Sequence, residues 1–135
     1  MKKLIIALLT MCAVPCFSQH SPCDLDTLFP SDFAQNWQRD SLGIDNSRKE
    51  FYITMFTDSK GRKKHLPLNG TTQECLIHYF GNPNKMHLDE STKTFIYYVA
   101  VSWISNDHNE YEGITIEFEI SNQTQLVTGY YFMIT

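Results

Sequence analysis

Apolar residues alternate with polar or smaller ones through the last third of the chain, and this period of two most constrains the fold. In 113–120, apolar side chains hold the even positions, whereas Thr115, Glu117 and Glu119 hold three odd ones. Successive side chains of a β-strand point to opposite faces, so a strand with one buried face has this pattern. Residues 94–104 and 125–134 also read as strands. Connections of hairpin length predict an antiparallel three-strand meander.

The residues before this meander have the spacing of helices. Phe33 and Trp37 are four positions apart within 30–43, which places them on one face of a short helix. Residues 45–56 predict a second helix, although their apolar pattern would also suit a strand. These segments are the only apolar material that can cover one face of the sheet.

Residues 71–80 have the clearest signals of a helix. Thr71 and Glu74 have the spacing of a capping box, Gly81 suits a left-handed C-cap, and Pro83 prevents continuation. We therefore expect a two-layer α+β domain, with two N-terminal helical segments packed on a C-terminal antiparallel three-strand meander. A cystatin-like arrangement of helix on sheet is the alternative.

The beginning of the chain has the three parts of a secretory signal peptide. Basic residues 2–3 precede apolar residues 4–14, and Ser18 is a small residue before a cleavage position. The apolar run is shorter than the roughly 20 residues that span a bilayer. Lipid attachment at Cys12 or Cys16 is the alternative.

These signals divide the chain into three parts. We expect a signal peptide at 1–18, an N-terminal arm at 19–36 and a single α+β domain at 37–135. The expected location is periplasmic or secreted, with no transmembrane segment in the mature chain and with association to the cell envelope as an option.

The charge of the chain argues against nucleic acid as a partner. The formal net charge is −4 at pH 7, whereas nucleic-acid binding depends on neutralising phosphates. The one basic cluster is in 59–66, with Lys60, Arg62, Lys63 and Lys64. It predicts a solvated loop, or a contact with an acidic partner or an anionic membrane surface.

Two cysteines remain after removal of the predicted signal peptide. Cys23 and Cys75 form an even number in an oxidising compartment, so we expect a disulfide that ties the N-terminal arm to the helix at 71–80.

Cys75 and His78 also lie three positions apart on the predicted helix. This spacing would allow a nucleophile and its base, or two metal ligands. Zinc needs three or four ligands, and no further Cys/His pair has the spacing of ligands. Packing or the disulfide is the favoured interpretation, and we expect no cofactor, metal or catalytic residue.

Asp107, Glu110 and Glu112 gather between two predicted strands. Calcium prefers such oxygen ligands, but Tyr111 stands where a ligand belongs in the twelve-residue calcium loop. A soluble hairpin loop is the favoured interpretation. Glu117 and Glu119 point the same way from one strand, and a glycosidase would need a deep cleft around such a pair.

The uncovered face of the sheet is the predicted binding surface. Aromatic side chains give a large contact area with few rotatable bonds, which suits recognition. The expected contact residues are Ile96, Tyr98, Thr115, Glu117, Glu119 and Tyr131.

Leu68, Gly70, Thr72 and residues 80–83 resemble a motif of the β-lactamase-inhibitor-protein-like fold, which includes the SmpA/OmlA-type lipoproteins of outer-membrane assembly. The resemblance covers about residues 37–134. It implies helices followed by an antiparallel meander, and binding to other proteins through the open sheet face. The chain departs from these lipoproteins because no cysteine of its leader follows a small residue.

We therefore predict a secreted or periplasmic protein that binds another protein and is not an enzyme. The alternative is a small hydrolase or metal-dependent enzyme that uses Cys75 and His78 or the loop from Asp107 to Glu112.

Overall fold

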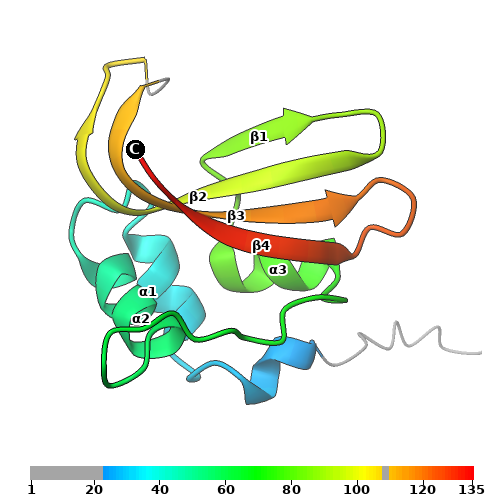
Figure 1. The fold of residues 1–135 in the computed structure, drawn as a ribbon, viewed down its shortest axis with the longest axis horizontal. Helices are drawn as coiled ribbons and strands as arrows, with labels where there is room; N and C mark the ends of the chain where they lie inside the picture. The colour runs from blue at the N-terminus through cyan, green and yellow to red at the C-terminus, as the bar shows by residue number, and fades with distance from the viewer. Residues whose placement is uncertain (1–22, 108–109) are drawn as a thin grey trace, which may run out of the picture.

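The computed structural model of this protein describes residues 23–107 and 110–135, which form an α+β fold (Figure 1). Three α-helices precede a four-stranded antiparallel sheet in these residues. In chain order the elements are the 3₁₀ helix η1 (Asp24–Thr27), α1 (Phe33–Arg39), α2 (Ser47–Phe56), α3 (Gln73–Phe80), β1 (Lys85–Leu88), β2 (Thr92–Ile104), β3 (Tyr111–Ser121) and β4 (Val127–Ile134).

The predicted class and the antiparallel meander are confirmed, but two details of the prediction were wrong. The helical layer contains three α-helices instead of two segments, and β1 adds a fourth strand at one edge of the sheet. β1 has only four residues, and its apolar side chains Met86 and Leu88 are exposed. So short a run contains too few alternations to identify a strand from sequence.

The strands lie in the order β1-β2-β3-β4, and the helices cover one face of the sheet (Figure 1). We call this the inner face and the opposite one the outer face. Every second residue of the central strands packs against the helices because strand side chains alternate between faces. The inner-face core residues of β2 and β3 are Phe95, Tyr97, Val99, Ile116, Phe118 and Ile120.

Aromatic side chains dominate the contact between the two layers. The ring of Phe80 on α3 lies 5.1 Å from Phe118 on β3 and 5.0 Å from Trp37 on α1, both edge-on. Such pairs add to the free energy of burial. Within the described residues, no helix is long and apolar enough to cross a membrane.

Helix α3 begins one residue later than its predicted capping box. Thr72 is the N-cap, and its hydroxyl accepts a hydrogen bond from the Cys75 amide at 3.1 Å. Thr71 is buried, and its carbonyl accepts a hydrogen bond from the amide of Val127 at 2.8 Å. Because two threonines are adjacent, the local motif did not distinguish the cap from the residue that pairs with the sheet. Gly81 ends the helix with a positive φ of 74°, but its ψ of −167° lies outside the left-handed helical region that was predicted.

The residues predicted as an N-terminal arm contribute to the core. Leu25, Phe29 and Phe33 are buried, and the ring of Phe29 stacks on Phe33 at 4.2 Å. The packed part of the chain therefore includes residues before Trp37, the predicted start of the domain. The predicted signal peptide at 1–18 lies outside the described residues.

A buried arginine joins the helical layer to the sheet. Arg48 of α2 donates hydrogen bonds to the carbonyls of Trp37 and Tyr98, each at 2.8 Å, and to the side chain of Asn84 at 3.1 Å. The guanidinium also lies 4.9 Å from the centre of the Trp37 ring. Burial lowers the Arg48 pKa to about 10, although nearby Asp40 favours the charged form. Arg48 is only 2% exposed, although a charged side chain is rarely buried to this extent.

Strands β2 and β3 curl toward the outer face at the end that carries Trp103 and Tyr111 (Figure 1). The register shifts twice in β2, between Tyr98 and Ala100 and between Val101 and Trp103. Such bulges bend a strand and increase its twist. Gly113 lies opposite the bend with φ of 154°, and a Cβ there would be 2.1 Å from the carbonyl oxygen of Ala100. Only glycine permits this approach.

Candidate functional site

The outer face brings together the residues that the sequence predicted as a binding surface. Glu117 of β3 pairs with Ile96 of β2 and with Tyr131 of β4, so the three share one row across the sheet. Tyr98, Thr115 and Met133 form the next row, and Glu119 lies two residues from Glu117 on the same face. The alternation therefore placed these side chains on the correct face.

Three of the predicted contact residues are nevertheless buried. Ile96, Tyr98 and Thr115 are 3%, 1% and 0% exposed, so the prediction that they form an open surface was wrong. The curl of β2 and β3 brings the Tyr111 ring within 4.8 Å of the Tyr98 ring. The ammonium of Lys85 in turn lies 5.1 Å from the Tyr111 ring. The curl of the sheet therefore buries the side chains at the centre of the outer face.

The predicted contact residues that remain accessible lie on β3 and β4. Tyr131 is 39% exposed, Glu119 is exposed and Glu117 is half-buried. Met133 is 44% exposed and was missed by the sequence analysis, although it follows Tyr131 at the period of two that could have identified it. We call Glu117, Glu119, Tyr131 and Met133 the outer-face cluster.

Glu117 contacts Tyr131 within this cluster and Thr115 beside it. The hydroxyl of Thr115 lies 3.4 Å from a carboxylate oxygen of Glu117 and donates to it. Burial raises the Tyr131 pKa, and the hydrogen bond to Glu117 and the charges of Glu117 and Glu119 raise it further. The Tyr131 hydroxyl is therefore held neutral beside a carboxylate.

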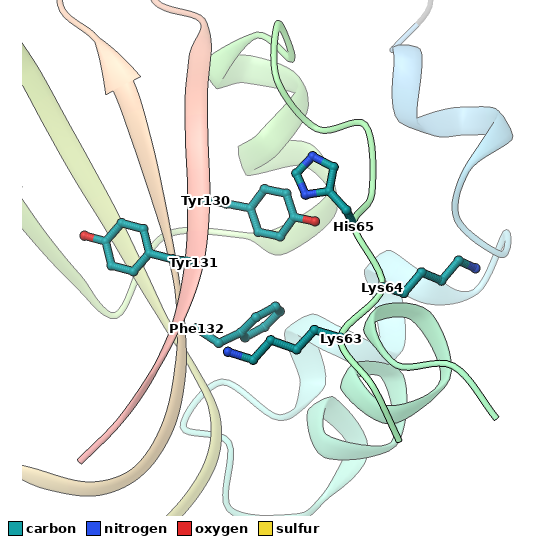
Figure 2. A pocket seen from close by; sticks show the side chains of 6 residues that line it. All are labelled: Lys63, Lys64, His65, Tyr130, Tyr131 and Phe132. Carbon is teal, nitrogen blue, oxygen red and sulfur yellow. The ribbon is translucent and has the colours of Figure 1, made fainter. Parts of the chain in front are cut away.

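A pocket of about 240 Å³ lies beside the outer-face cluster, at the edge of β4 (Figure 2). One wall is the strand, and the other is the extended segment 63–65, which comes from the basic cluster. Tyr130 and Phe132 point from β4 toward that segment, whereas Tyr131 points to the other side (Figure 2). The lining residues are Lys63, Lys64, His65, Tyr130, Tyr131 and Phe132.

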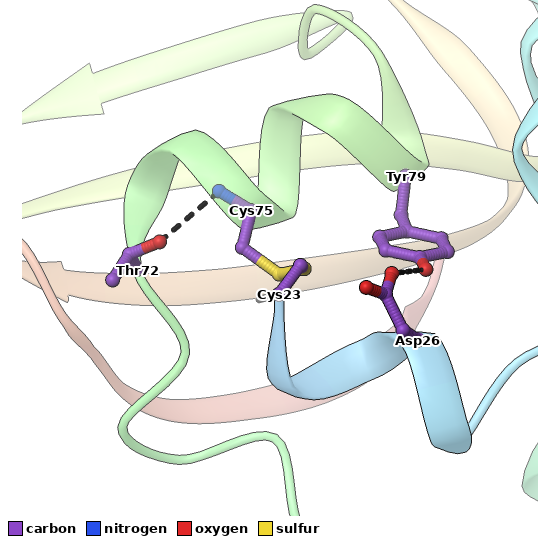
Figure 3. Close-up of a disulfide and its surroundings, with 5 residues drawn as sticks. All are labelled: Cys23, Asp26, Thr72, Cys75 and Tyr79. Atoms are coloured by element: carbon purple, nitrogen blue, oxygen red, sulfur yellow. Dashed lines mark hydrogen bonds between the residues drawn. A yellow bond between two sulfur atoms is a disulfide. The ribbon is translucent and has the colours of Figure 1, made fainter. Parts of the chain in front are cut away.

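Cys75 and His78 do not form a catalytic pair. Cys75 forms a disulfide with Cys23, with the two Cα atoms 5.6 Å apart, which confirms the predicted pairing (Figure 3). A sulfur held in a disulfide is not a thiolate nucleophile or a metal ligand. His78 is exposed on α3. Near the disulfide, Tyr79 donates a hydrogen bond to the Asp26 carboxylate (Figure 3).

The acidic loop between β2 and β3 is described only in part, because residues 108–109 lie outside the described chain. Asp107 accepts a hydrogen bond from the hydroxyl of Ser105 at 2.5 Å, and the Glu110 amide donates to the same hydroxyl at 3.0 Å. Within 23–107 and 110–135, no three His, Cys, Asp or Glu side chains are grouped so that they would hold a metal ion.

The basic cluster contributes one ion pair among the described residues. Arg62 pairs with Asp58 at 2.7 Å, and the Asp58 carboxylate also accepts hydrogen bonds from the amides of Lys60 and Arg62. These contacts lower the Asp58 pKa, with the Arg62 side chain as the largest cause. Lys63 and Lys64 are exposed and form no ion pair within that part of the chain.

Comparison with known proteins identified no relative of this chain. No protein-family model, curated protein or solved structure matches the chain.

Proposed function

We propose that this protein is a non-catalytic binding module that recognises another protein through the outer-face cluster. The observation that carries the proposal is the exposure of Tyr131 and Met133, beside two carboxylates, on a sheet face that no described helix covers (Figure 1). Exposed apolar side chains grouped with polar ones are typical of interaction sites.

The contacts of Glu117 with its neighbours support this role. Glu117 and Tyr131 lie opposite each other on paired strands, and the carboxylate also accepts a hydrogen bond from buried Thr115. A contact residue that is already oriented loses little conformational entropy when it binds. Tyrosine in particular offers a large apolar area together with one polar group.

We also propose that the protein is exported to the periplasm or secreted. The basic, apolar and small-residue parts of 1–18 support export, as does a Cys23–Cys75 disulfide, which persists in oxidising compartments. The resemblance of residues 68–83 to the β-lactamase-inhibitor-protein-like family supports the binding role by analogy only.

Site-specific photocross-linking tests the binding role. A photoreactive residue at position 131 should form a covalent adduct with a defined protein in intact cells. The matched control is position 86, because Met86 is also exposed but belongs to the inner face of β1. With the photoreactive residue moved to position 119, the native chain should form an adduct with the same protein. The double variant Tyr131→Ser and Met133→Ser should lose this adduct, with little change in melting temperature.

Two outcomes would count against the proposal. Identical adducts from positions 131 and 86 would indicate that the outer face is not distinctive. Retention of the position 119 adduct in the double variant would show that Tyr131 and Met133 do not contribute to recognition.

A further inference from the structure

The edge of β4 leaves part of its backbone without a hydrogen-bond partner in the described chain. The amides and carbonyls of Thr135 and Gly113 bond reciprocally, at 3.1 and 3.2 Å. Hydrogen-bonded and non-bonded pairs alternate along an antiparallel ladder. The register runs without a break from the pair Ile114–Ile134 to the pair Glu119–Gly129. Counting from the bonded pair Gly113–Thr135, every second residue of β4 is therefore in a non-bonded pair. These residues are Tyr130, Phe132 and Ile134, and their backbone amides and carbonyls point away from β3. No other described residue bonds to them.

Residues 70–71 pair with the first residue of β4, whereas the segment before them lies away from the rest of the strand. The Gly70 amide donates to the Val127 carbonyl at 2.7 Å, and the Val127 amide donates to the Thr71 carbonyl at 2.8 Å. Farther along, the Leu66 amide donates to the hydroxyl of Tyr130 at 2.7 Å instead of to the backbone of β4. The length of a tyrosine side chain therefore separates this segment from the strand.

The opposite wall of the pocket is fixed in place. The Lys64 amide donates to the carbonyl of Phe56, at the end of α2, at 2.7 Å, and Thr57 pairs with Lys63. The His65 ring stacks on the Tyr130 ring at 5.5 Å with 15° between their planes. Because these contacts hold segment 63–65, it does not close onto β4, and the pocket of about 240 Å³ remains between them.

The charge of the pocket indicates the kind of chain that would fill it. The Lys63 side chain extends from its segment toward β4, whereas Lys64 extends away from it (Figure 2). Lys63 has no acidic partner within the described residues. An incoming strand would direct alternate side chains toward Lys63 and His65, where a carboxylate would complement the ammonium.

We propose that the edge of β4 binds an extended acidic segment of a partner protein as an added strand. The backbone of Tyr130, Phe132 and Ile134 supplies the hydrogen bonds, and Lys63 selects acidic side chains. Addition of a strand to an exposed sheet edge is a general mode of peptide recognition. This site adjoins the outer-face cluster and shares Tyr131 with it, but it uses the backbone edge of β4 and Lys63, so it does not depend on the function proposed above.

An NMR titration tests the proposal with a seven-residue peptide of alternating glutamate and threonine. The amides of Tyr130, Phe132 and Ile134 should shift and become protected from hydrogen exchange. Lys63→Glu should weaken binding by about tenfold or more, since it replaces an attraction with a repulsion. The matched control is Lys60→Glu, in the same basic cluster but not in the pocket, which should change the affinity less than about twofold.

The backbone contact is tested by Ile134→Pro, which removes an amide that donates no hydrogen bond in the described fold. Ile134→Pro should lower the affinity for the peptide, whereas Ile134→Thr should leave it unchanged. Met133→Ser belongs to the outer-face cluster alone and should leave peptide binding unchanged.

Three results would overturn the proposal. Equal weakening by Lys60→Glu and Lys63→Glu would indicate charge attraction without a site. Equal binding of a lysine–threonine peptide would remove the selection for acidic side chains. A concentration-dependent dimer that Ile134→Pro abolishes would assign the edge to a second copy of this chain.

Discussion

The hydroxyl of Tyr79 donates to the Asp26 carboxylate between α3 and η1. Burial raises the Tyr79 pKa to about 12, and the hydrogen bond and charge of Asp26 add to the shift. A tyrosine with a raised pKa in the fold stabilises it fully below the unfolded pKa of about 10. That contribution is lost as the pH rises toward 12.

We therefore expect Tyr79→Phe to reduce the alkaline loss of stability. Urea unfolding at about pH 9 and about pH 11 should show a smaller fall in the free energy of unfolding for the variant than for the native chain. Asp26→Asn should also reduce the fall, because it removes the charge that opposes ionisation. Equal falls in all three proteins would show that this contact does not govern the pH dependence.

Single residues mark where sequence reasoning failed. The alternation of apolar residues placed Tyr98 on the correct face of the sheet. Its burial, however, depends on Tyr111, which the curl of the sheet brings into contact with it. Arg48 is buried because carbonyls of Trp37 and Tyr98, distant in sequence, satisfy its donors. Contacts of this kind leave no signal in the local pattern.

At the scale of elements, the curl of β2 and β3 depends on Gly113. Gly113→Ala would place a methyl group 2.1 Å from the carbonyl oxygen of Ala100, at a φ that side chains rarely adopt. We expect it to destabilise the fold by about 3 kcal/mol, measured by chemical denaturation. It should also increase the solvent exposure of Tyr98.

Gly129→Ala is the matched control on the neighbouring strand. The nearest atom to a Cβ there is a carboxylate oxygen of Glu119 at 3.8 Å, and the backbone has no positive φ. Its effect should be within about 0.5 kcal/mol of zero. A similar loss for both variants would contradict a specific role for Gly113.

The disulfide joins Cys23, the N-cap of η1, to α3 across a separation of 52 residues. In the chain-entropy model, a loop of this length stabilises the fold by about 4 kcal/mol. The Cys23→Ser and Cys75→Ser double variant should lose approximately this amount of unfolding free energy in denaturant titrations. A native chain with the same stability in reductant would show that the crosslink contributes nothing.

The elements differed in how far their sequences revealed them. Strands β2, β3 and β4 were predicted because their alternation extends over many residues, whereas β1 is too short. The bulges in β2 were not predicted, since tyrosine, valine and alanine suit either face there. Helix α3 was found from its caps, with an error of one residue at the N-cap.

For the whole molecule, export and the disulfide give one joint prediction. The protein purified from the cell envelope or medium should begin at Gln19 and should have no thiol that alkylates before reduction. Intact mass, measured with and without alkylation, checks both. A chain that retains Met1 with two alkylated cysteines in the domain would contradict export and oxidation together.

The candidate sites arise from contacts between distant parts of the chain. The sequence revealed the basic cluster and the aromatic strand separately, but Tyr130 and Leu66 meet only in the folded chain. Four of the six predicted outer-face residues lie on β3 or β4, and of these Glu117, Glu119 and Tyr131 remain accessible.

The pairing of Gly70 and Thr71 with Val127 limits how this protein can associate. Among the described residues, it leaves the β4 edge unpaired over 129–134, a span of about 20 Å, and β1 at the opposite edge has four residues. Long, flat edges nucleate fibrils because they template successive chains. With one edge shortened and the other minimal, the molecule can accept a short segment and still resist polymerisation at high concentration.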